Sequence, residues 1–503
     1  MKKIFLILLA FVGVFSSCTD LSDNLYDRIP SADFPENEAQ AALMTVPMYK
    51  PLQDYLDWGG YWFSQEVPSD EMVCPTRNAD WDDGGKWRIL HEHKWTNDVE
   101  ATNSMWSRFY KGIYEANKLI EYLQPAVDDG NEAAAITVAK CQIIRSFYYW
   151  NLIDNYGDVP YVTSFADAPA LPLKEDRATI WTNIVEELEA AAMVIPISSG
   201  SKYSVTKAMA YTLLVKLYLN AKVYKGLADF DNADLVKADA YCDTVINFGS
   251  FSLEANPLDP FVTDNELSSE NIFTIGYDED TYKGFNIHMR TLHYESKLTF
   301  DMSVQPWNGF AVMEAFYNTF SVDDKRNDMF LVDTQYTSAG IEIIDAAANN
   351  QTLVFDPHMP ALFIDGSYSF EEIRMSGVRF VKFEVKTGAS DNLSNDFPIF
   401  RYADILLMKA EAQIRLNGAG SGDTWINMIK NRAGIATPGS YNLDDLLAER
   451  GREMFCEAHR RMDLIRFGEY LEPWWEKEAD DSEDRNTFPI PKWVQDANPN
   501  LAD

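Results

Sequence analysis

The sequence predicts a mainly α-helical protein with long irregular loops and a minor amount of β structure. Apolar residues recur every three or four positions through several segments, which is the period of an amphipathic helix. Most of these segments follow one another in pairs separated by short breaks, whereas segments typical of strands are few. Of the 503 residues, 46% are hydrophobic, which is enough for a large core and excludes disorder as the main state.

Five helices are expected in the first half of the chain. They are predicted over residues 103–123, 132–156, 177–194, 206–224 and 235–248, the fourth of them capped by Ser204. Trp106, Trp150 and Trp181 lie on the apolar faces of the first three helices. We therefore expect these three tryptophans in the core.

The helical period returns near the C-terminus, over residues 402–416, 424–432 and 443–460. Between about residues 256 and 398 it lapses, and short strands are predicted over 271–277 and 378–385. Long irregular segments on a regular scaffold are where binding sites are usually built. Paired helices favour a helical repeat of about 34 residues per pair, but the repeat consensus is weak. Periodicity alone therefore leaves a solenoid and a bundle both open.

The chain is strongly acidic, with 43 Lys and Arg against 78 Asp and Glu and a net charge of −35. Binding to nucleic acid requires dense Lys and Arg against the phosphates, so no nucleic-acid partner is expected. Attachment to anionic lipid through a basic patch is excluded for the same reason.

The first residues predict export and a lipid anchor. A short basic start and an apolar run over residues 4–14 are typical of a signal peptide, and this run is too short to span a bilayer. Small residues before Cys18 resemble a bacterial lipobox, so residues 1–17 are expected to be removed and Cys18 to be acylated. Asp20 and Asp23 resemble the acidic tag that takes some lipoproteins to the cell surface. An ordinary signal peptide with an unrelated cysteine is the alternative.

The four remaining cysteines do not form a metal or redox motif. Cys74, Cys141, Cys242 and Cys456 lie far apart, and no two of them form a C-x-x-C. The last three lie in helical patterns, where buried thiols are expected. The sequence does not decide whether these cysteines form disulfides, because an exported protein meets an oxidising compartment.

A cluster of tryptophans predicts a carbohydrate-binding surface. Trp58, Trp62, Trp81, Trp87 and Trp95 lie within 38 residues, among Gly pairs and charged side chains and without a long helical period. A sugar ring stacks its C–H face on indole, and its hydroxyl groups require carboxylate, amide or guanidinium partners. We expect Trp81, Trp87 and Trp95 to stack on the ligand, Asp70, Arg77 and Arg88 to bind its polar edge, and Tyr282 and Trp307 to close the site. The alternative is that these tryptophans only fasten the loops to the helices.

Motifs along nearly the whole chain resemble the SusD/RagB family of outer-membrane nutrient-uptake lipoproteins. In the N-terminal half they are Ser69-Asp-Glu71, Asp80-Trp-Asp-Asp-Gly-Gly85, His93-Lys-Trp-Thr96, Trp106 with Tyr110, Ile113 and Asn117, Arg145 with Tyr148 and Asn151, and Tyr156-Gly-Asp-Val-Pro160. In the C-terminal half they are Phe400 to Ala412, Asn427 with Asn431-Arg432-Ala-Gly434, Glu449-Arg450 with Glu453, His459 with Asp463, Arg466 and Gly468, and Phe488-Pro-Ile-Pro491 with Asn498-Pro-Asn-Leu501.

This resemblance implies a tetratricopeptide-like helical core whose long loops carry a glycan site. It also implies docking as a lid on a SusC-like TonB-dependent transporter of the outer membrane. On this basis residues 1–17 are the lipoprotein signal peptide, 18–255 an N-terminal helical region with the aromatic-rich loop, and 256–503 the C-terminal SusD/RagB region. We expect a surface-exposed lipoprotein that binds an oligosaccharide or polysaccharide and delivers it without catalysis. A peptide-uptake lid, known in the same broad family, is an alternative.

A glycosidase is the weaker alternative. Glu449, Glu453 and Glu457 lie on one face of the predicted helix over 443–460, and two carboxylates can cleave a glycosidic bond. Interleaved arginines explain the same residues as ion pairs between helices, and Asp463 and Arg466 are expected to pair likewise. We therefore assign no catalytic residue.

No metal ligand or cofactor is assigned either. His91 and His93 lie two positions apart, and this lacks the spacing of a helical zinc motif. The adjacent acids Asp82 and Asp83, and those over residues 278–280, are candidates for a structural calcium, with solvated turns as the simpler interpretation.

Overall fold

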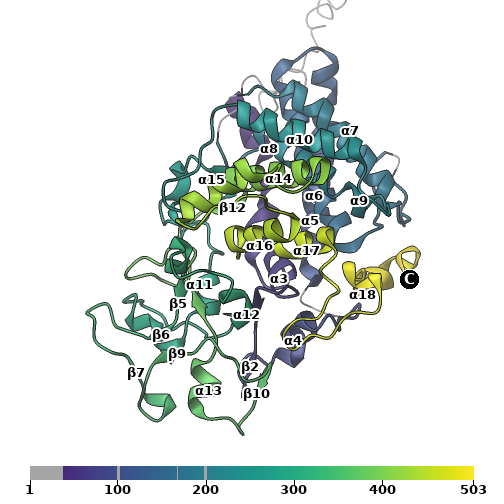
Figure 1. The fold of residues 1–503 in the computed structure, drawn as a ribbon. Helices are drawn as coiled ribbons and strands as arrows, with labels where there is room; N and C mark the ends of the chain where they lie inside the picture. Colours follow the sequence, from purple (N-terminus) through teal and green to yellow (C-terminus); the bar gives the residue numbers. More distant parts are fainter. Residues whose placement is uncertain (1–37, 99–101, 167, 198–200, 503) are drawn as a thin grey trace, which may run out of the picture.

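The computed structural model describes residues 38–98, 102–166, 168–197 and 201–502. It confirms the mainly helical fold. Long helices form the upper part of the molecule in Figure 1, and loops with short helices and strands form the lower part. The expected signal peptide and Cys18 lie outside the described residues.

The helices of the N-terminal half match the periodicity closely. They are α2 (Glu38–Tyr49), α3 (Tyr61–Glu66), α4 (Lys86–His91), α5 (Asn103–Asp128), α6 (Glu132–Tyr156), α7 (Arg177–Val194), α8 (Lys207–Leu219), α9 (Ala221–Tyr224) and α10 (Asn232–Asn247). Side chains of Asn131 and Asp176 cap α6 and α7. The prediction that Ser204 caps the fourth helix is wrong, because Thr206 accepts the capping hydrogen bond from Met209 N–H. That helix is also divided at Asn220.

The helices of the C-terminal half are α11 (Ile287–Thr291), α12 (Glu314–Tyr317), α13 (Phe370–Met375), α14 (Tyr402–Asn417), α15 (Asp423–Ala433), α16 (Leu443–Met454), α17 (Arg460–Phe467) and α18 (Lys492–Ala497). The single helix predicted over 443–460 is wrong. Cys456 and Ala458 have positive φ angles, 64° and 63°, which end α16. Hydrogen bonds from Trp62 Nε1 to the Cys456 carbonyl, 3.1 Å, and from Ala458 N–H to the Glu66 carboxylate, 2.6 Å, hold this turn.

The helices stack in the order of the chain. Helix α5 packs on α6, α6 on α7, α7 on α8 and α8 on α10, and the C-terminal α14 then adds to α10 and carries α15 and α16. Contacts between successive neighbours are typical of a helical repeat rather than of a bundle around one axis. The two halves of the chain therefore share one helical body (Figure 1).

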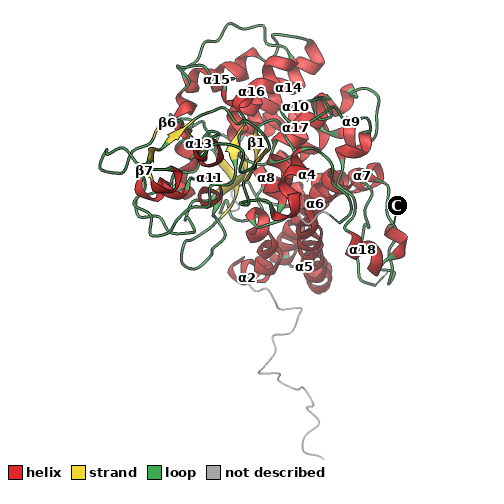
Figure 2. Cartoon of the chain, turned by 90° about the horizontal axis from the view of Figure 1, so that it is seen from below, coloured by secondary structure: helices red, strands yellow, loops and turns green. Residues whose placement is uncertain are grey.

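The strands are short and form two-stranded sheets. The pairs are β1 (Met72–Val73) with β4 (Ala311–Val312), β2 (Thr76–Arg77) with β10 (Phe363–Ile364), β3 (Asn271–Ile275) with β12 (Phe397–Arg401), β5 (Phe330–Leu331) with β11 (Arg379–Phe380), β6 (Asp333–Thr334) with β9 (Val354–Phe355), and β7 (Ile344–Asp345) with β8 (Gln351–Thr352). Only β2 and β10 pair in parallel. The strand predicted over 378–385 is reduced to the two residues of β11. Figure 2 shows the strands on one side of the helical body.

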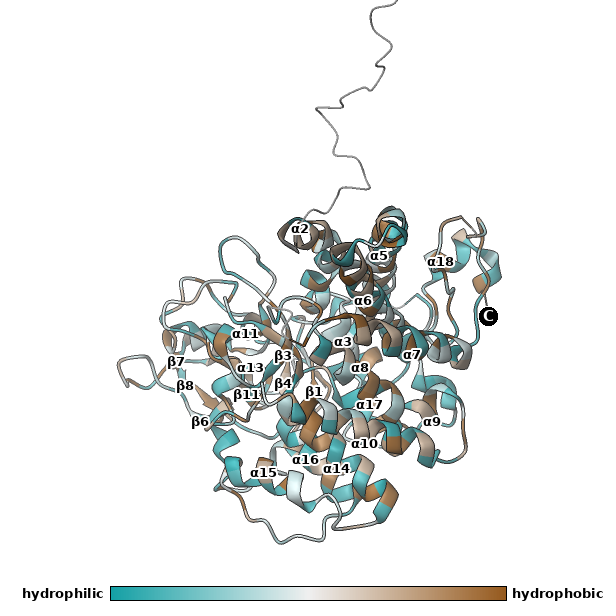
Figure 3. Ribbon diagram, turned by 90° about the horizontal axis from the view of Figure 1, so that it is seen from above, coloured by the Kyte–Doolittle hydropathy of each residue, from teal (hydrophilic) through white to brown (hydrophobic). Residues whose placement is uncertain are grey.

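The main core runs through the helical body, a second core lies among α14, α15 and α16, and a third, smaller core lies apart from both. Trp106, Trp150 and Trp181 are buried as predicted, and hydrophobic residues are concentrated on central helices such as α6 and α8 (Figure 3). The smaller core serves residues 333–376, which we call the peripheral lobe. It consists of Ile343, Ala348, Leu353, Phe355 and Met375.

The four cysteines after Cys18 are buried, and the described helices do not suit a bilayer. Cys74, Cys141, Cys242 and Cys456 are free and buried. Within the described residues, no helix is both long and apolar enough to cross a bilayer.

Candidate ligand-binding site

Three indole rings meet where the aromatic-rich loop contacts the loop after α11. The ring centre of Trp58 lies 5.9 Å from that of Trp81 and 5.9 Å from that of Trp307, and the planes of Trp58 and Trp307 differ by 30°. Trp58 is 38% exposed, and the other two are partly buried. We call Trp58, Trp81 and Trp307 the aromatic platform.

Trp81 is held in a strained conformation at the centre of the platform. Its φ angle is 60°, which is rare for a bulky residue. The indole Nε1–H donates a hydrogen bond of 2.7 Å to the Trp307 carbonyl oxygen. The ring also lies flat on Gly309, where an added Cβ would come within 2.5 Å of it. Such strain is often stored at functional sites, so its place here supports a binding role for the platform.

Helix α11 positions the loop that carries Trp307. The Trp307 N–H donates to the Met289 carbonyl, 2.7 Å, and the N–H groups of Gly309 and Phe310 both donate to the Arg290 carbonyl, 2.9 Å each. Residues of α11 therefore determine where the Trp307 ring lies.

The side chain of Arg290 lies behind Trp58. Its guanidinium carbon is 4.6 Å from the Trp58 ring centre and 4.5 Å from that of Phe63, which is a cation–π arrangement. Arg290 is 1% exposed, and its Nε and Nη1 have no hydrogen-bond partner. Burial lowers the pKa of Arg290 to about 9, against the opposing effects of Asp57 and Tyr277. The platform is thus backed by a buried cation that forms no ion pair with any acid of the described residues.

Polar groups surround the platform. The Arg108 guanidinium donates to the Asp57 carboxylate at 2.7 Å, and it pairs with Asp54 at 3.0 Å. On the side of Trp81, the Tyr294 hydroxyl donates to the Asp80 carboxylate, and Arg374 lies over the Tyr294 ring at 4.6 Å. Burial raises the pKa of Tyr294 to about 12, so its hydroxyl remains protonated at neutral pH. Carboxylates and a phenol of this kind suit the hydroxyl edge of a sugar.

The structure brings together two of the predicted ligand contacts and corrects two others. Trp81 and Trp307 belong to the platform. Trp87 and Trp95 are 1% and 3% exposed and present no face to solvent, so their predicted stacking role is wrong. Trp87 supports the platform from inside and donates to Asp83 at 2.8 Å, whereas Trp95 packs on Phe488 with ring centres 4.8 Å apart. Both serve as the fastening residues that the alternative interpretation described.

The predicted polar partners are engaged in structural contacts. Asp70 accepts two hydrogen bonds from Arg460, at 2.6 and 2.7 Å. Arg77 is 2% exposed and donates to the carbonyls of Ile373 and Ser376. Arg88 bonds to Thr76 and, at 2.8 Å, to Asp82. These contacts contradict a direct ligand role for buried Arg77 and show that Asp70 and Arg88 already have protein partners.

The remaining predicted residue, Tyr282, is exposed beside the site. It is 37% exposed, and its ring centre lies 6.4 Å from that of buried Tyr277. Tyr277 in turn is close enough to Arg290 and Asp57 for their charges to affect its pKa. Tyr282 can therefore extend the site, although it does not stack on the platform tryptophans.

Sequence reasoning missed Trp58 and Arg290 as site residues. Trp58 belongs to the tryptophan cluster of the sequence. It stands directly before Gly59 and Gly60 and outside any helical period, which indicates that it can be exposed. No local pattern marked Arg290, because its importance comes from contact with rings more than 200 positions away.

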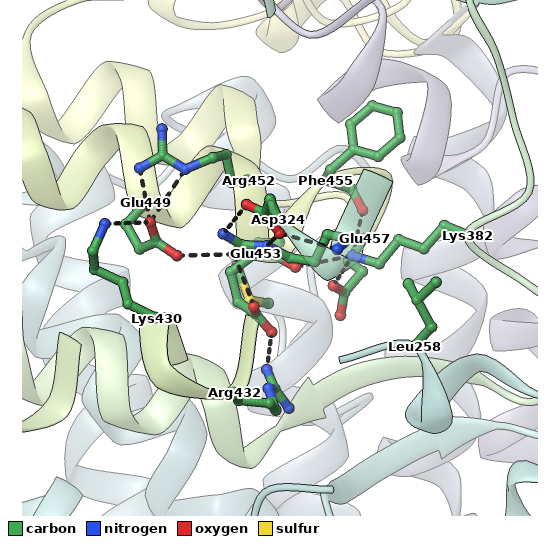
Figure 4. A network of polar contacts seen from close by, with 12 residues as sticks. Leu258, Asp324, Lys382, Lys430, Arg432, Glu449, Arg452, Glu453, Phe455 and Glu457 are labelled. Atoms are coloured by element: carbon green, nitrogen blue, oxygen red, sulfur yellow. Dashed lines mark hydrogen bonds and ion pairs between the residues drawn. The ribbon is translucent and has the colours of Figure 1, made fainter. Parts of the chain in front are cut away.

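The carboxylates considered for glycosidase activity lie in a buried ion-pair network (Figure 4). Glu453 contacts Arg326 at 3.1 Å, Arg401 at 2.8 Å and Arg432. Although burial raises the pKa of Glu453, Arg432 and Arg401 together hold it well below its ordinary value. This carboxylate is therefore ionised and fully engaged.

The neighbouring acids of the network are engaged in the same way. Glu449 pairs with Arg326 at 2.8 Å and Arg452 at 2.7 Å, and Glu457 pairs with Lys382 at 2.5 Å and Arg401 at 2.6 Å. Asp463 and Arg466 pair at 2.7 Å, as predicted. These groups join α16 and α17 to the loops around them, which confirms the structural interpretation of the spacing.

The described part of the chain contains no group of three or more potential metal ligands. His91 and His93 are buried, and burial lowers the pKa of each to about 4. His91 bonds to the Trp475 carbonyl at 2.8 Å, and His93 bonds to Asp480 at 2.7 Å. Both imidazoles are thus neutral at physiological pH, and each is held by a hydrogen bond to a protein group.

Comparisons with known proteins agree with the motifs. A model of the SusD family matches residues 365–501, and a model described as starch-binding associating with outer membrane matches residues 60–219. Starch-binding protein SusD of Bacteroides thetaiotaomicron is 23% identical over 452 residues, which cover 81% of this chain and 78% of that protein. SusD-like protein P25 of Formosa agariphila is 23% identical over 391 residues, covering 74% and 71%.

Solved structures show the same fold. Surface glycan-binding protein A from Bacteroides thetaiotaomicron, in complex with laminarihexaose, gives a TM-score of 0.74 at 21% identity, covering 92% of this chain and 98% of that one. A SusD superfamily protein from Parabacteroides distasonis gives 0.75 at 18% identity, covering 94% and 99%. With two family models matched in its two halves and SusD proteins among its relatives, the chain belongs to the SusD family.

Proposed function

We propose that this protein binds an oligosaccharide or polysaccharide on the aromatic platform and delivers it to a SusC-like TonB-dependent transporter without cleaving it. The observation that carries the proposal is the grouping of partly buried Trp81 and Trp307 around the exposed Trp58, with Trp81 held there at a cost in backbone strain. Indole faces offer sugar C–H groups a large apolar surface, and the surrounding carboxylates accept hydrogen bonds from hydroxyls.

The relatives support a glycan as the ligand. One is named as a starch-binding protein, another was solved with laminarihexaose, and a third is described as a laminarin-binding SusD-like protein. Acylation of Cys18 would hold the protein at the outer membrane, facing the outside of the cell. That location suits a protein that captures a polymer before uptake.

The absence of catalysis is part of the proposal. The paired acids that sequence spacing offered as acid and base, Glu449 and Glu453, each contact at least two cations and are buried. A general acid needs a raised pKa and access to the glycosidic oxygen, and Glu453 has neither. No cofactor is required for capture by stacking.

Calorimetry with the soluble chain, starting at residue 19, against a panel of glycans tests the proposal. Trp58→Ala and Trp307→Ala should each weaken binding about 30-fold, which corresponds to about 2 kcal/mol for loss of an aromatic hot spot. Trp493→Ala is the matched control, because this tryptophan is 51% exposed on α18, outside the platform. Equal affinities for wild type and both platform variants would refute the assignment of the site.

Two further measurements separate the alternatives. A glycosidase would release reducing sugar from the bound glycan, and Glu453→Gln would stop the release. A peptide-uptake lid would bind oligopeptides and ignore every glycan of the panel. Removal of calcium with a chelator should leave glycan affinity unchanged.

The proposed partner and anchor can be tested in membranes. Tagged full-length protein should recover a plug-and-barrel transporter from detergent-solubilised outer membranes. Cys18→Ser should release the protein from the membrane fraction. Recovery without any transporter, or membrane attachment that survives Cys18→Ser, would contradict this part of the proposal.

A further inference from the structure

A second concave site lies away from the aromatic platform. A cavity of about 1290 Å³ is enclosed by the end of α6, the start of α7, α9, and residues 468–490, which we call the C-terminal strap. In Figure 1, α9 and α18 lie on the right of the molecule, whereas α11 lies on the left and β10 at the bottom. None of the three platform tryptophans lines this cavity.

Four partly buried cations line the cavity, and they are Lys174, Arg177, Lys222 and Arg485. Among the residues that the structure describes, no ion pair to a carboxylate is found for Arg177, Lys222 or Arg485. The Arg177 guanidinium lies 5.0 Å from the Tyr224 ring centre, and its Nε has no hydrogen-bond partner. Arg485 donates only to a carbonyl, that of Trp95, at 2.8 Å. These three cations therefore lack the anionic partners that such groups usually have.

The acids of the same cavity are placed differently. Asp158, Glu483 and Asp484 line it and are exposed, and Asp158 accepts its hydrogen bond from the backbone N–H of Arg177 rather than from the guanidinium. Burial lowers the pKa of Arg177, even though Asp154 and Asp158 oppose this effect. The cations of the lining are thus more buried than its acids, in a chain with a net charge of −35.

Other buried arginines of this protein have carboxylate partners, which Arg177 and Arg485 lack. Arg401, Arg450 and Arg466 are each buried against two or more carboxylates. A cation removed from water without a partner is costly, and a bound anion would remove that cost through charge-assisted hydrogen bonds. The three unpaired cations form a receptor for an anionic group.

Other lining residues favour a saccharide as the carrier of that group. Asn97, Asn486 and Thr487 provide amide and hydroxyl groups for sugar hydroxyls. The strands of the described residues lie in other segments, so no strand edge lines the cavity for a peptide to extend. The volume exceeds the roughly 300–1,000 Å³ of typical small-molecule sites, which suits a ligand of several sugar units.

We propose that this cavity binds an acidic oligosaccharide, whose carboxylate groups are held by Arg177, Lys222 and Arg485, at a site separate from the aromatic platform. The site adds a second ligand class to the proposed function. It does not depend on the platform for any of its contacts.

Calorimetric titration of the soluble chain with tetragalacturonate tests the site, with a neutral maltotetraose as comparison. Wild type should bind the acidic probe, and the affinity should fall as salt rises because the contacts are ionic. Arg177→Met and Arg485→Met should each weaken binding of the acidic probe at least tenfold. Lys118→Met is the control, since this lysine is 63% exposed on α5 and should bind as wild type does.

Three more variants keep the test independent of folding and of the platform. Arg177→Lys retains the charge and should keep most of the affinity, and Lys222→Met provides a second removal on a different element. Trp58→Ala should leave binding of tetragalacturonate unchanged, so failure of the glycan platform and failure of this cavity are distinguishable. Lack of binding at millimolar tetragalacturonate, equal binding by Arg177→Met, or tighter binding of a tetra-aspartate peptide would overturn the proposal.

Discussion

The charged network around α16 and the aromatic platform are both rich in interactions, but they differ in how completely those interactions are satisfied. In the network, Glu453 and Arg401 are buried and each contacts several groups of opposite charge. In the platform, Trp58 is 38% exposed, Trp81 is strained, and Arg290 beside Trp58 has nitrogens without a partner among the described residues.

This difference separates structural residues from binding residues better than residue type does. Acids and arginines suggested chemistry in the sequence, yet the structure satisfies them within the fold. Tryptophans are ordinary core residues, yet the three of the platform stay partly exposed. A large or charged side chain whose packing or hydrogen bonds are incomplete therefore indicates a candidate site in this protein better than residue type does.

The largest expected effect is the loss of the charge at the centre of the network. Glu453→Gln keeps the volume of the side chain but leaves Arg326, Arg401 and Arg432 with one carboxylate fewer. Breaking a buried ion pair costs about 3–5 kcal/mol, so the free energy of unfolding should fall by about that much. Urea denaturation followed by tryptophan fluorescence measures it. Unchanged stability would mean that the network contributes no more than a surface pair.

The free energy of unfolding should depend on pH through a second cluster of buried acids, Glu66 and Glu71, which differs in this respect from the network around Glu453. Glu66 and Glu71 are both buried, and burial raises the pKa of Glu66 to about 8 and that of Glu71 well above its ordinary value. Lys382 and Glu457 act on Glu66, and Arg460 and Asp70 act on Glu71. Unlike Glu453, these acids are not surrounded by enough cations to keep them ionised.

Because Glu66 binds its proton more tightly in the folded state, its contribution to stability is complete below about pH 4.5 and is lost as the pH rises through about 8. The free energy of unfolding should therefore decrease from about pH 5 to pH 9, on the order of 1.4 kcal/mol per unit of pH at most. Glu66→Gln, which carries no titratable proton, should reduce this slope in denaturation curves across that range. A steeper slope in the variant would contradict the assignment.

A smaller effect is expected when the packing under the platform is changed. Gly309→Ala places a methyl group 2.5 Å from the Trp81 ring and 2.8 Å from the Arg290 carbonyl. Overpacking of this kind costs about 1–3 kcal/mol and should displace Trp81, so glycan affinity should fall about tenfold. Gly366→Ala is the control, because its nearest atom would be 3.8 Å away and its φ angle is ordinary. Equal glycan affinities for the two variants would show that Trp81 does not contribute to binding.

The smallest effect on stability is expected for an ion pair at the surface, which is compared with the buried network. Lys492 and Asp496 form an ion pair of 2.9 Å with side chains 50% and 65% exposed. Asp496→Ala should change the free energy of unfolding by less than about 0.5 kcal/mol. A loss comparable to that of Glu453→Gln would mean that burial is not what gives the network its importance.

The long helices could be predicted from the sequence because their signals are local. The bounds of α6 and α7 follow from periodicity, a capping Asn or Asp, and a terminal Gly or Pro. The break after Met454 could not be predicted, since it depends on hydrogen bonds from Trp62 and to Glu66, almost 400 positions away.

The candidate site was predictable in composition but not in detail. The cluster from Trp58 to Trp95 includes two rings of the platform, and Trp307, which was predicted to lie beside this cluster, contacts Trp58 in the structure. Which rings are open was not predictable, because Trp87 and Trp95 are covered by residues distant in sequence, such as Phe310 and Phe488. Burial of a loop tryptophan is decided by tertiary contacts that leave no local pattern.

The peripheral lobe has its own small core, and its parallel pairing of β10 with β2 joins it to the segment that leads into Trp81. Substitutions inside that small core can therefore reshape the surface beside the aromatic platform while the helical body keeps its packing. Phe363 and Phe370, 47% and 50% exposed, are the large apolar side chains that this lobe would move first.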